Sequence, residues 1–411
     1  MSVKLKNKMD EAWDYIWAGL FNPQTRLFYD YRTSLHPETQ FAHLPTPEEI
    51  ALQFPNPAGW GTGMEDSMLN AGSVMEILCL RKELESYPEA LSLASQVLGG
   101  ILSCAYGHGV DGFLVRSLCP DDGQSCYFNS SRDQFTLAVY GVWRFLNTFP
   151  EAPEKLRADA KRLLVDIARY CERVIDPDHD DLLRLDGKPA LVSTMVNVAP
   201  HERLRLPMFY AAAWAATDDP HWFDLYRQYA RSGIVDTLAI DRSRRWWDWE
   251  LPQLQLSLAR LREIEPEAVL KKQYADAMLI TADLASRELR DRQARAAGYL
   301  GNWDVPNLDW RQMPMTTRPE TLTPSSRSML FGGYPYLMPQ FPEAFHTPYS
   351  LLRGVGNLAY AALMCPEFKP VPDLLTGFLQ TAIKPNYSQH HSDGAINILH
   401  GYWTGLKRGF F

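Results

Sequence analysis

Charged and hydroxylated residues gather at the starts of several helix-like segments, where they could do acid–base chemistry. In "NSSRDQF", Ser131, Arg132 and Asp133 come directly before an apolar helical run. A carboxylate beside an arginine stays ionised, which suits a general base that activates water or a group that binds sugar hydroxyls. The alternative is an aspartate that caps a helix within a structural ion pair. The long glycine-containing lead-in, which also carries Arg116, favours a functional role.

A second acidic pair lies in "GMEDS", where Glu65 and Asp66 are adjacent. On a helix their side chains diverge by roughly 100°. One can therefore face a site while the other caps the helix or orients a neighbour. Both could instead simply favour the positive end of the helix. We predict that at least one of the two is functional.

Two further clusters combine acids with histidine or tryptophan. "HERLRLP" presents His201 and Glu202 with an arginine, a compact acid–base and anion-binding set, although charges are common at helix starts. In "RSRRWWDWE", three tryptophans within four residues cannot all point into the core from one helix face. We expect one ring to be a flat platform for a sugar, with Asp248 or Glu250 nearby. The other candidates in this cluster are Arg245, Trp246 and Trp247.

The last two clusters lie in the C-terminal third of the chain. "HHSDG" contains the adjacent His390 and His391. No carboxylate or cysteine spacing completes a metal site around them, so we expect no metal and favour substrate contact or proton transfer. "GNWDVPNLDWRQ" adds Trp303 and Trp310, which we interpret as a lid or wall.

Composition limits the class of protein. The formal net charge of -8, without a basic stripe, argues against a nucleic-acid partner or an anionic membrane surface. No apolar run has signal-peptide character or membrane-spanning length. We therefore expect a soluble, cytoplasmic protein, or a periplasmic one if a leader has been removed. A homo-oligomer is left open.

The cysteines show neither CxxC nor Cys/His zinc spacing. Cys79, Cys104, Cys171 and Cys365 fall in apolar helical runs and are expected to be reduced core residues. Cys119 and Cys126 flank "PDDGQS" and could form a bridge in an oxidising compartment.

Amphipathic segments of helical length recur throughout, whereas clear strand alternation does not. No Pro/Gly/Ser linker divides the chain, which predicts one domain over 1–411. The long stretch at about 294–347 is rich in proline, glycine and aromatics, and we interpret it as a loop or lid region in which a few short strands could form. The predicted helices, about twelve, are 8–20, 67–84, 89–106, 131–147, 153–172, 203–216, 219–232, 245–262, 266–293, 348–364, 370–382 and 395–407.

The loops between these helices alternate in character. Long, chemically rich loops precede the even-numbered helices, and short, plain ones mostly precede the odd-numbered helices. Helical hairpins stacked in a ring place alternate helices on an inner circle, all running the same way. Their N-terminal loops then meet at one mouth, so the six clusters would form a single site.

At this point the chain resembles the six-hairpin glycosidase superfamily, the (α/α)6 toroid of many carbohydrate-active enzymes. The likeness lies in the helix count, the loop asymmetry and the segments "GWGTGMEDSMLNAG", "DGFLVRSLCPDDGQSCYFNSSRDQF" and "HHSDGAINILHGYW". The resemblance implies carbohydrate chemistry, commonly inverting hydrolysis by paired carboxylates. Some toroids are instead lyases that act on uronic acids, or sugar epimerases.

Inverting hydrolysis needs a protonated acid and a carboxylate about 6.5–9.5 Å apart. Acids on different inner helices can meet that spacing, so we pair Asp133 with Glu65 or Asp66 and keep Asp248 in reserve. The arginines in these loops suit bidentate carboxylate recognition, which predicts an oligosaccharide substrate that contains uronic acid. Those arginines are Arg116, Arg132, Arg203, Arg244, Arg245 and Arg311.

Other functions stay open at this stage. In a lyase, His201 or His391 with Tyr127 or Tyr334 could abstract the proton next to a uronate carboxylate. An epimerase would need similar histidines. A glycan-binding toroid without activity would keep the tryptophans but need not gather so many acids. No P-loop, GxGxxG after a strand or GxSxG elbow is present, so no cofactor is expected.

Overall fold

The computed structural model describes residues 3–176, 179–298, 305–317 and 337–411, and in these ranges the chain is mainly helical, as predicted. Two series of helices alternate along it. The helices of one series are buried on nearly all sides. They are α3 (Ser67–Glu85), α5 (Arg132–Thr148), α7 (Arg205–Thr217), α9 (Glu250–Ile264), α12 (Glu343–Met364) and α14 (Gly394–Lys407). We call these the central helices.

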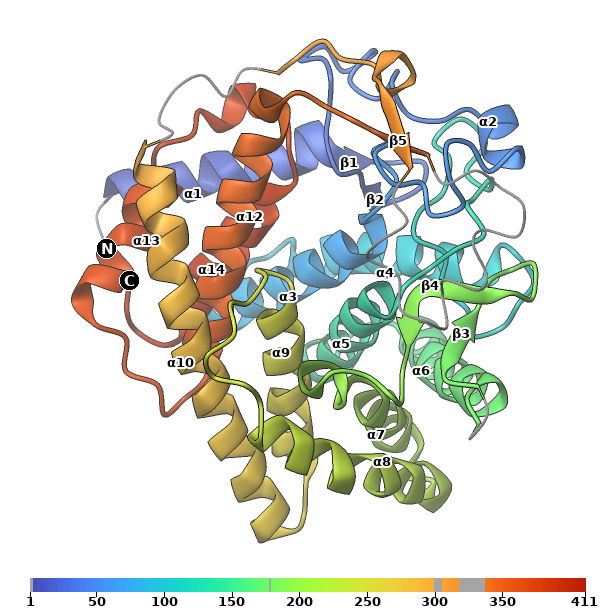
Figure 1. Cartoon of the computed structure of the whole chain (residues 1–411), viewed down its shortest axis with the longest axis vertical. Helices are drawn as coiled ribbons and strands as arrows, with labels where there is room; N and C mark the ends of the chain where they lie inside the picture. Colours follow the sequence, from blue (N-terminus) through green and yellow to red (C-terminus); the bar gives the residue numbers. More distant parts are fainter. Residues whose placement is uncertain (1–2, 177–178, 299–304, 318–336) are drawn as a thin grey trace.

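The helices of the other series bury one face and expose the other, as amphipathic surface helices do. Long helix α6, for example, buries nine of its 21 residues. In Figure 1, α3, α5, α9 and α14 lie near the middle of the view, with α6, α8, α10 and α13 toward its edges. This series consists of α1 (Val3–Tyr15), α4 (Ala90–Tyr106), α6 (Glu154–Val174), α8 (Pro220–Leu238), α10 (Ala268–Gly298) and α13 (Pro372–Ala382).

Each central helix packs against the next one in the chain. The contacting pairs are α3–α5, α5–α7, α7–α9, α9–α12 and α12–α14, and α14 also contacts α3. One apolar cluster draws residues from helices along the whole chain, from Leu5 of α1 to Trp403 of α14. None of the described helices is both long enough and apolar enough to cross a membrane.

Glycines allow two of these pairs to pack closely. A Cβ on Gly356 of α12 would lie 2.2 Å from the backbone carbonyl carbon of Asn397 in α14. A Cβ on Gly72 of α3 would lie 2.2 Å from the backbone oxygen of Leu137 in α5. Real Cβ atoms do not approach other atoms so closely, so these helix pairs require glycine at both positions.

In the part of the chain that the structure describes, strands are short and occur in three antiparallel pairs. The pair β5–β6 (Met315–Thr317 and Leu337–Pro339) lies in the long loop where short strands were expected. The pairs β1–β2 (Phe21–Asn22 and Leu27–Phe28) and β3–β4 (Asp181–Leu183 and Pro189–Thr194) were not predicted. Strands of two to six residues leave too little alternation in a sequence to be recognised.

Short helices complete the connections. They are α2 (Pro47–Ala51), the π-helical turn Ile16–Leu20 after α1, and the 3-10 turns Pro200–Glu202, Trp310–Gln312 and Tyr387–Gln389. The predicted start of helix 348–364 was wrong, because α12 begins at Glu343 and contains Pro348. A proline inside a helix removes one backbone donor, and here the buried packing of α12 outweighs that loss. All six cysteines are unpaired, and the four expected in the core are buried.

Candidate functional site

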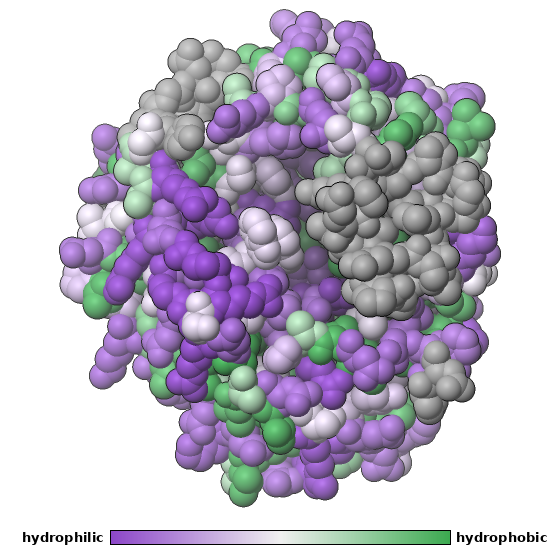
Figure 2. Space-filling model, viewed as in Figure 1, coloured by the Kyte–Doolittle hydropathy of each residue, from purple (hydrophilic) through white to green (hydrophobic). Residues whose placement is uncertain are grey.

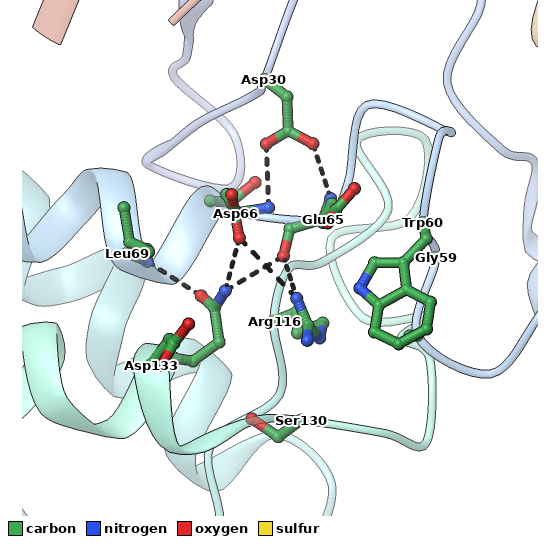
Figure 3. Close-up of polar contacts among 12 residues, drawn as sticks. Asp30, Gly59, Trp60, Glu65, Asp66, Leu69, Arg116, Ser130 and Asp133 are labelled. Atoms are coloured by element: carbon green, nitrogen blue, oxygen red, sulfur yellow. Dashed lines mark hydrogen bonds and ion pairs between the residues drawn. The ribbon is translucent and has the colours of Figure 1, made fainter. Parts of the chain in front are cut away.

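The predicted acidic pair stands at the start of α3 and is held there by Asp30, which follows β2. One Asp30 oxygen accepts a hydrogen bond from the backbone N–H of Glu65 (2.8 Å), and the other accepts from the N–H of Asp66 (2.9 Å). Figure 3 shows both Asp30 oxygens turned toward these two backbone groups. The pair therefore does not depend on the helix end alone for its position.

Asp66 is bound on several sides by protein groups. It accepts a hydrogen bond from Gln134 Nε2 of α5 (2.8 Å) and one from Arg353 Nη1 of α12 (3.2 Å). The Nη1 atom of Arg116 lies 3.7 Å from Asp66 and donates to the backbone oxygen of Glu65 (2.9 Å). Asp66 thus joins three parts of the chain through contacts with Gln134 and with two arginines.

Four carboxyl groups share this region: Asp30, Glu65, Asp66 and Asp393. Burial, and then the charge of Asp66, raises the pKa of Glu65 to about 7. Burial likewise raises the pKa of Asp393 to about 7, although Arg353 opposes the shift. The pKa of Asp30 is raised as well, by burial and by the three neighbouring carboxylates. Glu65 can therefore hold a proton near neutral pH.

Glu65 is also accessible, because it lines a cavity of about 80 Å³. Asp30 and Asp66 line it too. The segment around β6 and the start of α12 contributes a largely apolar part of the lining: Met338, Pro339, Phe341, Phe345, His346 and Tyr349. In the space-filling view, the surface is hollowed near the centre of the face seen in Figure 1 (Figure 2).

Asp133 lies in the first turn of α5, next to Gln134 and so one residue from the group that binds Asp66. Its side chain is 21% exposed and forms an ion pair with Arg205 of α7. Burial alone would raise the pKa of Asp133, but Arg205 and Arg132 outweigh it and hold the pKa below the ordinary value of 3.8. Asp133 is therefore a carboxylate at neutral pH, in contrast to Glu65.

A second polar group continues from Asp133 toward α7 and α9. Glu202 accepts a hydrogen bond from Arg132 Nε (2.6 Å). His201 Nε2 lies 3.3 Å from a Glu250 oxygen, and Arg244 pairs with the same Glu250. Burial, with the nearby arginines, lowers the pKa of His201 to about 3. The imidazole is therefore neutral, and among the described residues its Nδ1 has no hydrogen-bond partner.

Two tryptophan rings form an exposed stacked pair just before α9. Trp247 and Trp249 lie 5.2 Å apart with 11° between their planes, and are 55% and 37% exposed. The Arg353 guanidinium lies 6.0 Å from the Trp249 ring and also reaches Asp66. The pair is therefore connected to the acidic cluster through one side chain. Trp246, by contrast, is buried with its ring edge-on to His201.

The other predicted residues divide between the site and the core. Asp248 is buried, 4.0 Å from Arg292, and its charge acts on Arg353. His391 is buried with Nε2 3.1 Å from the backbone oxygen of Phe345, and His390 is buried beside it.

Two of the predicted residues fall outside the site. Arg245 is 62% exposed and pairs with Asp291 of α10. Trp310 is fully buried and donates its indole N–H to the His43 backbone oxygen (2.7 Å). Neither offers a surface to a ligand bound at the cluster. Trp303 lies outside the described residues.

Four side chains that organise the cluster were not predicted: Asp30, Gln134, Arg205 and Arg353. Asp30 lies in "YDYR", where an acid between two aromatic residues is a weak signal of a buried carboxylate. Arg353 lies inside a long helix and has no local signal. Among the described residues, no set of three or more histidine, cysteine, aspartate and glutamate side chains is placed to hold a metal ion.

A scan against protein-family models found no match, and a search of curated proteins found no similar sequence. The function must therefore be inferred from the geometry of the site.

Proposed function

We propose that the central helices form the inner circle of an (α/α)6 toroid, with the candidate site at its mouth. Two observations support this arrangement. The central helices contact one another in chain order, and α14 contacts α3. Hydrogen bonds also join the starts of neighbouring central helices. The backbone N–H of Leu69 in α3 donates to Gln134 Oε1 of α5 (2.9 Å), and Asn70 Nδ2 of α3 donates to the Asp393 carboxylate before α14 (2.9 Å). Helices that meet start to start run in parallel, so their N-terminal loops share one end.

The function that the site supports best is glycoside hydrolysis, with Glu65 as the acid and Asp133 as the base. The proposal rests on the position of the two carboxyl groups at adjoining helix starts, where their surroundings shift the two pKa values in opposite directions. The pKa of Glu65 is raised to about 7, while the pKa of Asp133 is held below 3.8. Paired groups whose pKa values are pushed apart by their surroundings are typical of acid–base catalysis.

In this mechanism Glu65 donates its proton to the oxygen of the leaving sugar, and Asp133 accepts a proton from the attacking water. The link from Asp66 to Gln134 fixes the start of α3 relative to the start of α5, and so fixes the two catalytic groups relative to each other. The Trp247–Trp249 pair supplies flat apolar faces of the kind that pack on sugar rings. Attack by water on the face opposite the leaving group inverts the anomeric centre.

The preference for uronic acid stays a prediction with less support. Arg116 is engaged by Asp66 and by the Glu65 backbone, and the other five predicted arginines each pair with a carboxylate. The five pairs are Arg132–Glu202, Arg203–Asp236, Arg244–Glu250, Arg245–Asp291 and Arg311–Glu49. A substrate carboxylate would therefore compete with protein carboxylates for these guanidinium groups.

The lyase that the sequence left open gains no support from its candidate tyrosines. Tyr127 is buried and donates to the Phe54 backbone oxygen (2.6 Å), and Tyr334 lies outside the described residues. Epimerisation and binding without turnover are further outcomes that the same experiment separates.

The test is a panel of neutral and uronate-containing oligosaccharides, followed both for new reducing ends and for the ultraviolet absorbance of unsaturated products. We expect reducing ends only, and a loss of at least a hundredfold in kcat for Asp133→Asn and Glu65→Gln. Asp121→Asn, an exposed acid in the same lead-in, is the matched control and should keep full activity. Unsaturated products would show that the reaction is an elimination rather than a hydrolysis. Full activity in both site variants would reject the assigned roles.

A further inference from the structure

A second and larger cavity lies at the other end of the central helices. Its volume is about 460 Å³, and its walls come from the C-terminal halves of α3, α5, α9, α12 and α14 together with the start of α10. The candidate catalytic groups lie at the N-terminal ends of the same helices. The cavity is therefore separate from the site described above, and its size is in the range of small-molecule pockets.

The charged residues that line this cavity are mostly basic, in a protein whose net charge is -8. Among the described residues, two acids line it, Glu76 and Glu263. Two further acids, Glu83 and Glu367, pair with lining residues from outside the wall. The six basic lining residues are Arg144, Arg260, Arg262, Lys271, Lys407 and Arg408. Even with every one of these acids counted, the positive charges remain in excess.

Helix ends explain part of this charge. The C-terminal end of a helix carries a partial negative charge and attracts cations. Arg408 follows this rule, since it donates to the backbone oxygens of Leu363, Cys365, Pro366 and Phe368 at and after the end of α12. These bonds of Arg408 all go to backbone oxygens, so none of them pairs its positive charge with a carboxylate.

Arg260 is not explained in this way. Its side chain is only 4% exposed, and its Nη1 pairs with Glu263 at the rim. The guanidinium carbon lies 4.6 Å from the centre of the Trp143 ring. Among the described residues, Nε and Nη2 have no hydrogen-bond partner. These two nitrogens form the edge of a guanidinium that binds a carboxylate or phosphate in a bidentate manner.

A buried charged donor without a partner is costly, so such groups usually meet a water or a ligand. An oxyanion would supply the acceptors that Arg260 Nε and Nη2 lack, in a cavity where basic side chains outnumber acidic ones. We propose that this cavity binds a small, multiply charged oxyanion, carrying phosphate or carboxylate groups, through Arg260 and the basic residues around it.

The experiment is isothermal titration calorimetry of the whole protein with pyrophosphate and, separately, with citrate. We expect one of them to bind, with an affinity that falls as salt is added, and to lose at least tenfold in Arg260→Gln. Tighter binding of pyrophosphate identifies a phosphate ligand, and tighter binding of citrate identifies a polycarboxylate. Arg245→Gln, which removes an exposed arginine of the other end, is the control and should bind as the wild type does.

Lys271→Gln provides a second variant, because this lysine is exposed on α10 and its loss should not disturb folding. We expect a loss of affinity of a fewfold. The proposal is overturned if neither anion binds the wild type at millimolar concentration, or if affinity is unchanged in Arg260→Gln. Should Arg260→Gln fail to fold, unchanged affinity in Lys271→Gln overturns the proposal instead.

Discussion

Replacing Glu65 by glutamine should make the protein more stable at alkaline pH while removing its proposed activity. Burial raises the pKa of Glu65 from its ordinary value of 4.5 to about 7. As the pH rises through this window, the unfolded chain releases the proton and the folded chain retains it. Stability is therefore lost between about pH 4.5 and 7, and the full penalty applies above that range. Glutamine does not titrate, so the variant escapes the penalty.

The size of the effect follows from the two pKa values. Each pKa unit corresponds to about 1.4 kcal/mol, so the separation amounts to about 3.4 kcal/mol as an upper limit. Part of the Glu65 side chain faces the cavity, where water screens its charge. We therefore expect Glu65→Gln to exceed the wild type by about 1–3 kcal/mol near pH 8 and to match it near pH 4.

Urea unfolding of both proteins at several pH values measures this difference. Glu83→Gln is the matched control of opposite sign. In the wild type, Arg144 and Lys407 outweigh the effect of burial and lower the pKa of the Glu83 carboxyl. The contribution of this carboxylate to stability is therefore present above about pH 4.5 and is lost at lower pH. That variant should be destabilised above this pH, and progressively less as the pH falls below it. A Glu65→Gln variant that shows a constant difference at every pH, or no gain near pH 8, would refute the electrostatic reasoning.

Three further substitutions test the packing and the site. Gly356→Ala should cost on the order of 1–3 kcal/mol in the free energy of unfolding, because its Cβ would collide with the Asn397 backbone; an unchanged unfolding midpoint would contradict the close approach of α12 and α14. Asp30→Ala leaves two backbone N–H groups before α3 without their acceptor, and should lower kcat and cost about 1–3 kcal/mol of stability, as unfolding curves and turnover would show. Trp249→Ala should raise KM about tenfold, equivalent to about 1.4 kcal/mol, with kcat little changed. A fall in kcat with KM unchanged would contradict a role of this ring in substrate binding.

The positions of most helices could be predicted from the sequence because their apolar periodicity and boundary residues agree. The predicted helix 219–232, for example, starts where the structure places the cap Asp219 and the first residue of α8, Pro220. The predicted helix 348–364, by contrast, starts too late, because α12 begins at Glu343 and Pro348 lies inside it. Local patterns cannot show that packing elsewhere compensates for a lost backbone donor.

Only the parts of the candidate site that lie at helix starts could be predicted from the sequence. Glu65, Asp66 and Asp133 were found because acids at helix starts are visible in a sequence. Arg353 was missed because it lies within a helix, more than 280 residues from Asp66, and only the fold brings them together. Trp310 was assigned to a wall because its neighbours are polar, yet its ring is buried. The partner of a side chain, rather than its type, decides its role.

Carbon-13 NMR titration of the Glu65 and Asp133 side-chain carboxyl carbons tests the proposed acid–base pair most directly. The variants Glu65→Gln and Asp133→Asn identify the signal of each carboxyl, because that signal is lost in the corresponding variant. Glu65 should titrate near pH 7 and Asp133 below 3.8, so that one is protonated and the other ionised over the intervening range. If both titrate near their ordinary values, or if their order is reversed, the two carboxyl groups are not an acid and a base set apart by their surroundings.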